Sequence, residues 1–323
     1  MTVIGFLKKT VAVPVALAVT LGMAQADTIR IALAETPSDE MAAFFVALER
    51  AKANGLDYEW TAFSDEELAI QAVLSGQMDI GFGTPYAAMQ KSKAPLRIIF
   101  QLSKLKFFPV TSKKYETLAD LDGEPILLHS RGGGTDSIAN VIEEKVGMKF
   151  GERSYVPGSS NRVVALVAGQ AEATILDLSN TNKIMEQHPD MFNVLEMFEV
   201  EASDEALFAN LDWIQANEED VQIFVDALYT TWRDMNADPT IISKETNPDG
   251  PIGQLPPEIL GSLDDFYTAA VKGGLYDPEG GGMKAAQADM EWYSEAGQLE
   301  GDPASLNIDD FWYMAPLEAA KAK

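Results

Sequence analysis

A glycine-rich turn, Ser130-Arg131-Gly132-Gly133-Gly134-Thr135-Asp136, is the stretch whose residue types best suit binding chemistry. It follows an apolar run at 125–129 that predicts a strand, and it precedes an amphipathic pattern from Ser137 that predicts a helix. Glycines admit a ligand close to the backbone, and the first N–H groups of a helix attract anions. Arg131 can hold a carboxylate, sulfonate or phosphate through two hydrogen bonds. The turn therefore predicts an anion site, although three glycines beside a solvated arginine can also build a plain tight turn.

Residues 1–26 have the pattern of a secretory signal peptide. Lys8 and Lys9 precede a short apolar stretch at 11–22, and the small residues Ala24 and Ala26 occupy the positions that a signal peptidase reads. That stretch is too short to span a bilayer comfortably. The sequence contains no cysteine, which excludes a lipid-anchored cysteine, disulfides and thiol chemistry. We expect a free periplasmic protein from which residues 1–26 are removed.

The chain is strongly acidic, with a formal net charge of −26 at pH 7. Such a field opposes binding to nucleic acid and to anionic lipid. An anionic ligand would need a local concentration of N–H groups and arginine to hold it. We therefore expect a small-molecule ligand and no nucleic-acid or membrane-surface partner.

Strand patterns at 28–34, 58–63, 78–82 and 96–103 alternate with helix patterns, which predicts an α/β fold with mostly parallel sheets. In such sheets, ligands lie beyond the carboxyl ends of the strands. Those ends here are Glu35 to Ser38 and Gly83 to Tyr86. Tyr86, as a lone aromatic residue, suits a buried core equally well.

A second series of strand patterns, at 125–129, 154–156 and 173–176, follows a crossing segment at 105–112. The two series contain an internal sequence repeat. The run at 72–79 is matched by the run at 165–172, and in both an apolar helix ends at a glycine before a short strand. The alignment places Asp177 where the first series has Thr84. Asp177 opposite Arg131 would suit a zwitterion, or Asp177 caps the helix that follows it.

The chain therefore divides into two lobes whose facing strand ends form a cleft. Lobe one is expected at 27–106 and 203–323, and lobe two at 107–202. Helix patterns at 218–236, 256–272, 283–295 and 309–322 form a helical C-terminal tail, whose aromatic residues we expect to fasten it onto lobe one.

These features together resemble a known family. The Thr36-Pro37-Ser38 turn, the run Ser75-Gly76-Gln77-Met78-Asp79-Ile80-Gly81, the glycine turn and the run at 168–173 look like solute-binding proteins of ABC importers, in the group for nitrate, sulfonates, taurine and thiamine-pyrimidine precursors. The resemblance covers most of residues 28–236. It implies a type II periplasmic binding fold, whose two lobes close by a hinge on a small molecule that is handed to a membrane permease with its cytoplasmic ATPase.

The resemblance also implies the site. The family's contacts fall on these residues of the present chain: Thr36, Ser38, Gly83, Thr84, Tyr86, Arg131, Gly133, Gly134 and Thr135. We add Asp177, where many relatives carry an aromatic or amide neighbourhood. The expected ligand is a small anionic or zwitterionic solute such as a sulfonate, a taurine-like compound or a carboxylate. We expect a monomer that has no cofactor, metal or catalytic residues.

Other functions remain open at this stage. One alternative ligand is a pyrimidine of the thiamine-precursor type. The same fold also hosts a pyrimidine-phosphate synthase, but that activity is associated with histidine and cysteine, and this chain has only His129 and His188. A third alternative is presentation of the ligand to a chemoreceptor or sensor kinase.

Overall fold

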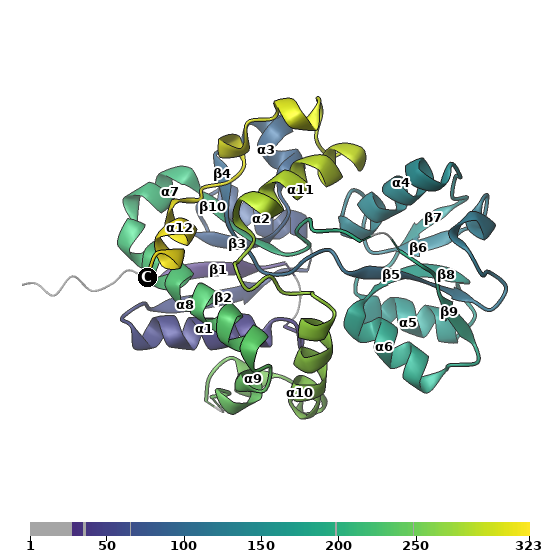
Figure 1. The fold of residues 1–323 in the computed structure, drawn as a ribbon, viewed down its shortest axis with the longest axis horizontal. Helices are drawn as coiled ribbons and strands as arrows, with labels where there is room; N and C mark the ends of the chain where they lie inside the picture. The colour runs from purple at the N-terminus through teal and green to yellow at the C-terminus, as the bar shows by residue number, and fades with distance from the viewer. Residues whose placement is uncertain (1–27, 35–36, 65, 198, 248) are drawn as a thin grey trace, which may run out of the picture.

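The computed structural model describes residues 28–34, 37–64, 66–197, 199–247 and 249–323. Within these residues, the strands form two five-stranded sheets that lie side by side, with helices packed on their faces (Figure 1). We call the half built on the first sheet lobe one and the half built on the second sheet lobe two. The predicted signal peptide and Thr36 lie outside the described residues.

The sheet of lobe one has the order β2-β1-β3-β10-β4. Its strands are β1 (Ile29–Leu33), β2 (Tyr58–Ala62), β3 (Ile80–Gly83), β4 (Leu96–Gln101) and β10 (Ala206–Asn210). β1 pairs in parallel with β2 and β3, whereas β10 is antiparallel to both β3 and β4. The sheet is therefore mixed, because β10 returns from lobe two in the opposite direction.

The central strands of this sheet are buried on both faces, and alternate residues of a central strand face opposite cores. In β10, for example, Leu207 and Ala209 pack in one apolar core, and Ala206 and Phe208 pack in the other. The first core is covered mainly by α1 (Ala42–Ala53), α8 (Glu218–Ala237), α10 (Pro257–Lys272) and α12 (Ala315–Lys321). The second is covered by α2 (Glu66–Leu74), α3 (Tyr86–Ser92) and α11 (Gly282–Glu295). Two short helices, α7 (Leu211–Ala216) and α9 (Ile241–Lys244), complete the lobe.

The sheet of lobe two has the order β7-β6-β8-β5-β9, which repeats the mixed pattern of lobe one. Its strands are β5 (Phe107–Ser112), β6 (Ile126–Leu128), β7 (Arg153–Tyr155), β8 (Ala173–Asp177) and β9 (Phe192–Val194). Helix α4 (Gly134–Val146) packs on one face, and α5 (Ser159–Val167) and α6 (Leu178–Gln187) pack on the other. The crossing strand β5 is antiparallel to β8 and β9.

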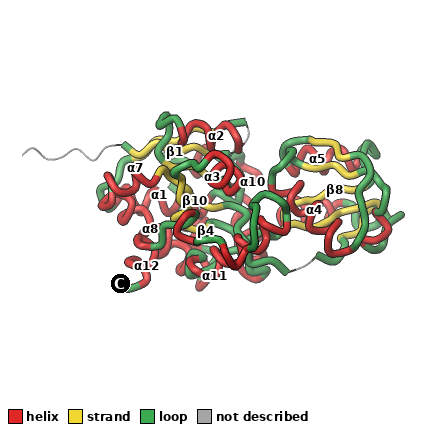
Figure 2. Tube along the Cα trace, turned by 90° about the horizontal axis from the view of Figure 1, so that it is seen from above, coloured by secondary structure: helices red, strands yellow, loops and turns green. Residues whose placement is uncertain are grey.

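Two chain segments join the lobes, one from β4 to β5 and one from β9 to β10 (Figures 1 and 2). They run antiparallel, with an isolated bridge between Lys104 and Ser203. The buried Gln101 side chain donates a hydrogen bond to Ser203 Oγ at 3.0 Å. This pair of segments is the expected position of the hinge.

The C-terminal tail packs on lobe one, as its aromatic residues predict. Trp292, Tyr293, Phe311 and Trp312 are all buried in the second core. The helix predicted over 309–322 is shorter and begins at Ala315, because the backbone of Trp312 pairs with Ile98 at the edge of β4. Among the described helices, none has the length and apolar character needed to cross a bilayer.

Candidate functional site

A cavity of about 610 Å³ lies between the lobes. From lobe one it is lined by the loop after β1, the start of α2, the end of β3 and the start of α10. From lobe two it is lined by the glycine turn, the start of α5 and the start of α6, and residues at the ends of the crossing segments complete the wall. A volume of this size suits a small organic molecule.

Five of the predicted site residues line this cavity: Ser38, Thr84, Gly134, Thr135 and Asp177. They come from both lobes, so the fold brings together the strand ends that the sequence indicates. Gly83, Tyr86, Arg131 and Gly133 are not among the described lining residues, and Thr36 cannot be placed.

Gly83 does not line the cavity, but it lies against the Glu66 side chain, which does. Its φ of +125° is a conformation that favours glycine, and a Cβ at this position would overlap the Glu66 carboxylate. That close approach lets the Thr84 N–H donate to Glu66 Oε1 at 2.6 Å. Gly83 therefore shapes the cavity wall through Glu66.

Tyr86 is a core residue, so its assignment to the site is corrected. Its side chain is fully buried, its hydroxyl donates to Asp289 Oδ2, and the same hydroxyl accepts a 3.0 Å hydrogen bond from Trp312 Nε1. As the first residue of α3, Tyr86 packs against the C-terminal tail, with its ring centroid 4.6 Å from that of Tyr293.

Arg131 also lies outside the cavity lining. Its side chain is exposed, and its guanidinium lies over the Tyr155 ring, 5.3 Å from the ring centroid. Gly133 is the N-cap residue of α4, where Ser130 Oγ occupies the space that a Cβ would need. The side chain that was expected to hold an anion is therefore stacked elsewhere.

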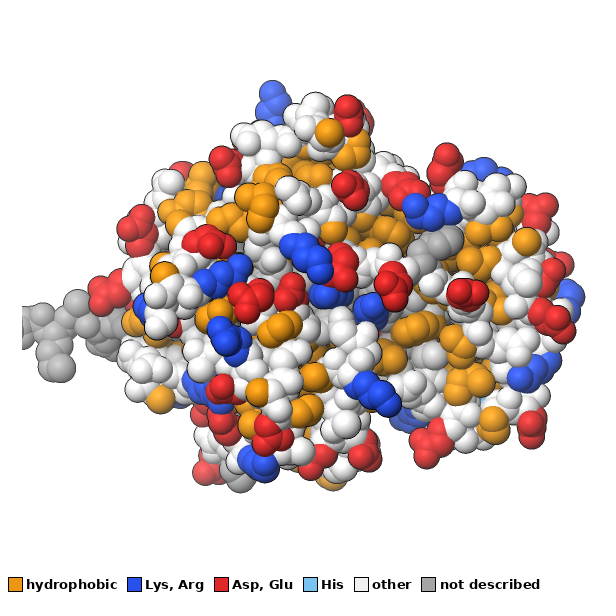
Figure 3. Space-filling view, in the orientation of Figure 1, with side chains coloured by type: hydrophobic (Ala, Val, Ile, Leu, Met, Phe, Trp, Pro, Cys, Tyr) orange, Lys and Arg blue, Asp and Glu red, His pale blue; other side chains and the backbone are white. Residues whose placement is uncertain are grey.

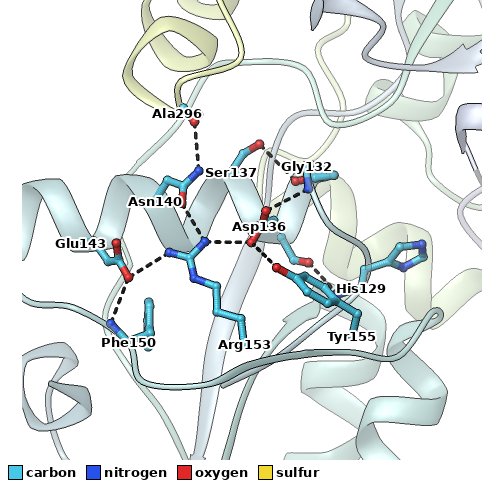
Figure 4. Close-up of polar contacts among 12 residues, drawn as sticks. His129, Gly132, Asp136, Ser137, Asn140, Glu143, Phe150, Arg153, Tyr155 and Ala296 are labelled. Atoms are coloured by element: carbon cyan, nitrogen blue, oxygen red, sulfur yellow. Dashed lines mark hydrogen bonds and ion pairs between the residues drawn. The ribbon is translucent and has the colours of Figure 1, made fainter. Parts of the chain in front are cut away.

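The glycine turn is organised by the protein's own carboxylate, Asp136 (Figure 4). Gly132 N–H donates to Asp136 Oδ2 at 2.8 Å, and Arg153 donates to Asp136 Oδ1, also at 2.8 Å. Thr135 Oγ1 accepts a hydrogen bond from His129 N–H at 2.9 Å. Part of the predicted anion-binding capacity of the turn is therefore satisfied within lobe two.

Asp177 caps a helix, as the alternative interpretation predicts, and it also faces the cavity. Its Oδ1 accepts a 2.7 Å hydrogen bond from Asn180 N–H at the start of α6. Across the cavity, Ser179 Oγ donates to Asp39 Oδ2 at 2.8 Å and joins α6 to the loop after β1. Burial raises the pKa of the Asp39 carboxyl, and the nearby charge of Asp177 raises it further.

The sequence interpretation missed most of the acidic lining. The carboxylates that it missed are Asp39, Glu40, Glu66, Asp204 and Glu205. Asp39 and Glu40 directly follow the predicted turn after β1, so the position of that turn could have indicated that they line the cavity. Asp204 and Glu205 precede β10, and the antiparallel direction of β10 brings its amino end to the edge where β3 has its carboxyl end. In lobe two, β5 is likewise antiparallel to β8. Its first residue, Phe107, therefore pairs with Asp177 at the end of β8 and lines the cavity.

The two histidines lie in different surroundings. His129 Nδ1 accepts a 3.2 Å hydrogen bond from Gly158 N–H, and the His188 ring packs edge-on against Phe192. Within the described ranges, no group of three or more histidine, aspartate or glutamate side chains is arranged to hold a metal ion.

A sequence profile described as NMT1/THI5 like matches residues 39–241, more than half of the chain. The chain belongs to the NMT1/THI5-like family. Among curated protein sequences, none matches this NMT1/THI5-like chain.

Solved structures resemble this NMT1/THI5-like protein over nearly its whole length. A protein from Bordetella bronchiseptica RB50 has a TM-score of 0.73 at 18% identity, with 92% of this chain and 98% of that chain covered. The periplasmic nitrate-binding protein NrtA from Synechocystis PCC 6803 has a TM-score of 0.68 at 12% identity, with coverage of 92% and 89%. The alkanesulfonate-binding protein SsuA from Xanthomonas axonopodis pv. citri, bound to MOPS, has a TM-score of 0.61 at 17% identity, with coverage of 86% and 96%. At such low sequence identity, the structural similarity shows the fold alone. It confirms the predicted two-lobed periplasmic binding fold.

Proposed function

We propose that this protein is the solute-binding component of an ABC importer. In this proposal, residues 1–26 direct export to the periplasm and are removed, and the mature monomer encloses a small organic solute between its lobes. The closed complex then docks on a membrane permease with its cytoplasmic ATPase. The family assignment and the likeness to nitrate-binding and alkanesulfonate-binding proteins support this function.

The observation that carries the proposal is the polar cavity between two lobes that are joined by two crossing segments. Its walls come from both lobes, and the Asp39–Ser179 hydrogen bond crosses it. A ligand that contacts both walls favours the closed arrangement because it binds that arrangement more tightly. The site needs no chemistry of its own for this task.

The cavity lining gives less support to an anionic ligand than the sequence does. The prediction of a sulfonate, taurine-like or carboxylate ligand depends on Arg131 and on free N–H groups of the glycine turn. Arg131 stacks on Tyr155, and Gly132 N–H is bonded to Asp136. A pyrimidine of the thiamine-precursor type remains an alternative ligand, because Phe63 and Phe107 in the lining offer surfaces for a flat ring.

Thermal unfolding of the exported protein tests the function. The protein is first refolded to remove any bound ligand and is then screened against sulfonates, carboxylates, amino acids, amines, nitrate and pyrimidines. A ligand at about a thousand times its dissociation constant stabilises the folded state by roughly 4 kcal/mol, which moves the unfolding midpoint by several degrees. We expect a midpoint shift together with a smaller radius of gyration in solution scattering. Deletion of the gene should abolish uptake of the same compound, and normal uptake after deletion would count against the importer role.

A further inference from the structure

The charged side chains that line the interlobe cavity are mainly negative. Among the described lining residues, six are carboxylates: Asp39, Glu40, Glu66, Asp177, Asp204 and Glu205. Arg162, Lys183 and His129 are the basic side chains in the same lining, and His129 Nδ1 accepts a hydrogen bond from Gly158 N–H. Acidic side chains are also spread over the outer surface of both lobes (Figure 3), so the field of the whole chain adds to that of the cavity.

Arg162 and Lys183 are poorly placed to hold an anionic ligand. The buried Arg162 guanidinium donates to Val156 O at 3.1 Å, to Ser159 Oγ at 2.8 Å and to Ile175 O at 3.0 Å, so it fastens β8 to the start of α5. Lys183 lies one turn into α6 with an exposed side chain. The arginine is therefore structural, and the lysine charge is screened by solvent.

The N-terminus of α4 already faces a carboxylate of the protein. A Cβ added at Gly134, the first residue of α4, would lie 3.6 Å from Asp204 Oδ1. Asp136 takes the N–H of Gly132 within the same turn. An anionic group of a ligand would have to enter beside both charges, which opposes its binding.

Closure brings further like charges together. Asp39 comes from lobe one and Asp177 from lobe two, and their charges interact across the cavity. Ser179 donates one hydrogen bond to Asp39, but it brings no positive charge. A cation bound between the two lobes would offset this repulsion and would therefore favour the closed arrangement.

The lining also has an apolar component. The half-buried rings of Phe63 and Phe107 line the cavity together with Ile259. The face of an aromatic ring attracts a cation, and the attraction strengthens when the cation is desolvated. The cavity thus combines carboxylates with apolar surface, which matches a charged amine on a hydrocarbon body.

We propose that the cleft selects a positively charged organic solute, a protonated or quaternary amine with an apolar portion, held between Asp39 and Asp204 of lobe one and Asp177 of lobe two. This inference rests on the proposed function, because it names the ligand class of the same interlobe site.

The first experiment uses a small-molecule extract separated at pH 7 into three pools: compounds retained by a cation-exchange resin, compounds retained by an anion-exchange resin, and neutral compounds. The refolded, exported protein is unfolded thermally with each pool. We expect the cationic pool alone to raise the unfolding midpoint. A rise with the anionic or neutral pool and none with the cationic pool would overturn the cation inference and leave the solute-binding function standing. No rise with any pool would contradict the solute-binding function itself.

The second experiment uses charge-neutralising variants and the amine isolated from the cationic pool, identified by mass spectrometry. Asp39→Asn and Asp204→Asn should each weaken its binding about ten- to a hundredfold, as expected for loss of a charged partner. Glu186→Gln, which removes an exposed charge of α6 outside the cavity, is the matched control and should leave binding unchanged. Equal binding by all three variants would remove these carboxylates from the site. Unfolding midpoints without ligand separate loss of binding from loss of folding.

Discussion

Ser179 Oγ and Asp39 Oδ2 are 2.8 Å apart and join the two lobes across the candidate binding cavity. The bond links the start of α6 in lobe two to the loop after β1 in lobe one. It is formed outside the two crossing segments, so it joins the lobes at a further place. Its strength should therefore affect how readily the cleft closes.

Ser179→Ala should shift the lobes towards an open arrangement. Loss of one hydrogen bond is expected to weaken ligand binding by about two- to tenfold, with a similar factor for ligands of any charge, because the effect acts on closure. Solution scattering should show a larger radius of gyration, and calorimetry should show the weaker binding. Ser305→Ala, at an exposed serine in the tail, serves as the control. If Ser179→Ala leaves both quantities unchanged, the bond does not govern closure.

Asp289 should make stability depend on pH. Burial raises the pKa of this carboxyl to about 6 from an ordinary 3.8, even though Tyr86 and Ser203 donate hydrogen bonds to it. The native state therefore binds a proton more readily than the unfolded state between these values. As the pH falls from 7 to 4, wild type should gain up to about 3 kcal/mol of stability relative to Asp289→Asn.

Denaturant unfolding of both proteins across this pH range checks the prediction. The quantity to compare is the difference between wild type and Asp289→Asn, because other carboxylates titrate in both proteins. A difference that stays constant with pH would show that Asp289 remains charged in the fold.

Gly83→Ala should destabilise the protein and disturb the cavity wall. The φ of +125° strains any residue with a Cβ, and that atom would displace the Glu66 carboxylate from Thr84 N–H. We expect a loss of about 1–3 kcal/mol in the free energy of unfolding. Gly261→Ala in α10 is the matched control, because no atom crowds a Cβ there and alanine favours a helix by up to about 1 kcal/mol. Chemical denaturation should therefore give changes of opposite sign, and a stable Gly83→Ala would contradict the prediction.

Arg131→Ala should leave ligand affinity unchanged, which reverses the expectation from sequence. The side chain is exposed and stacked on Tyr155, outside the described lining of the cavity. Calorimetry with the amine isolated from the cationic pool is the measurement. A tenfold loss of affinity would mean that the arginine turns into the cleft when a ligand is present.

The sequence predicts the elements well because the central strands of both sheets are buried and are marked by apolar runs. Ser38 and Thr84 were found because each follows a parallel strand, where the position of a loop can be inferred. Asp204 precedes β10 and Phe107 is the first residue of β5, and both were missed because the antiparallel direction of these strands is visible only in the folded sheet.

The errors at Tyr86 and Arg131 have a different cause. Tyr86 is turned into the core by Asp289 and Trp312, which lie more than two hundred residues away in the sequence. The path of the glycine turn depends on Asp136, whose bonds to Gly132 and Arg153 cannot be inferred from residue spacing. Tertiary contacts, rather than local pattern, decide which polar side chains reach the cavity.

The strand order of lobe one also constrains how the chain folds. β10 lies between β3 and β4, although all of lobe two is inserted in the sequence before it. Lobe two is continuous and can complete its sheet as soon as β9 has emerged. Lobe one must wait for a central strand that is supplied late, and closing that long loop is slow. During export, lobe two should therefore become resistant to proteases first, while the edges of β3 and β4 remain open to chaperones until β10 arrives.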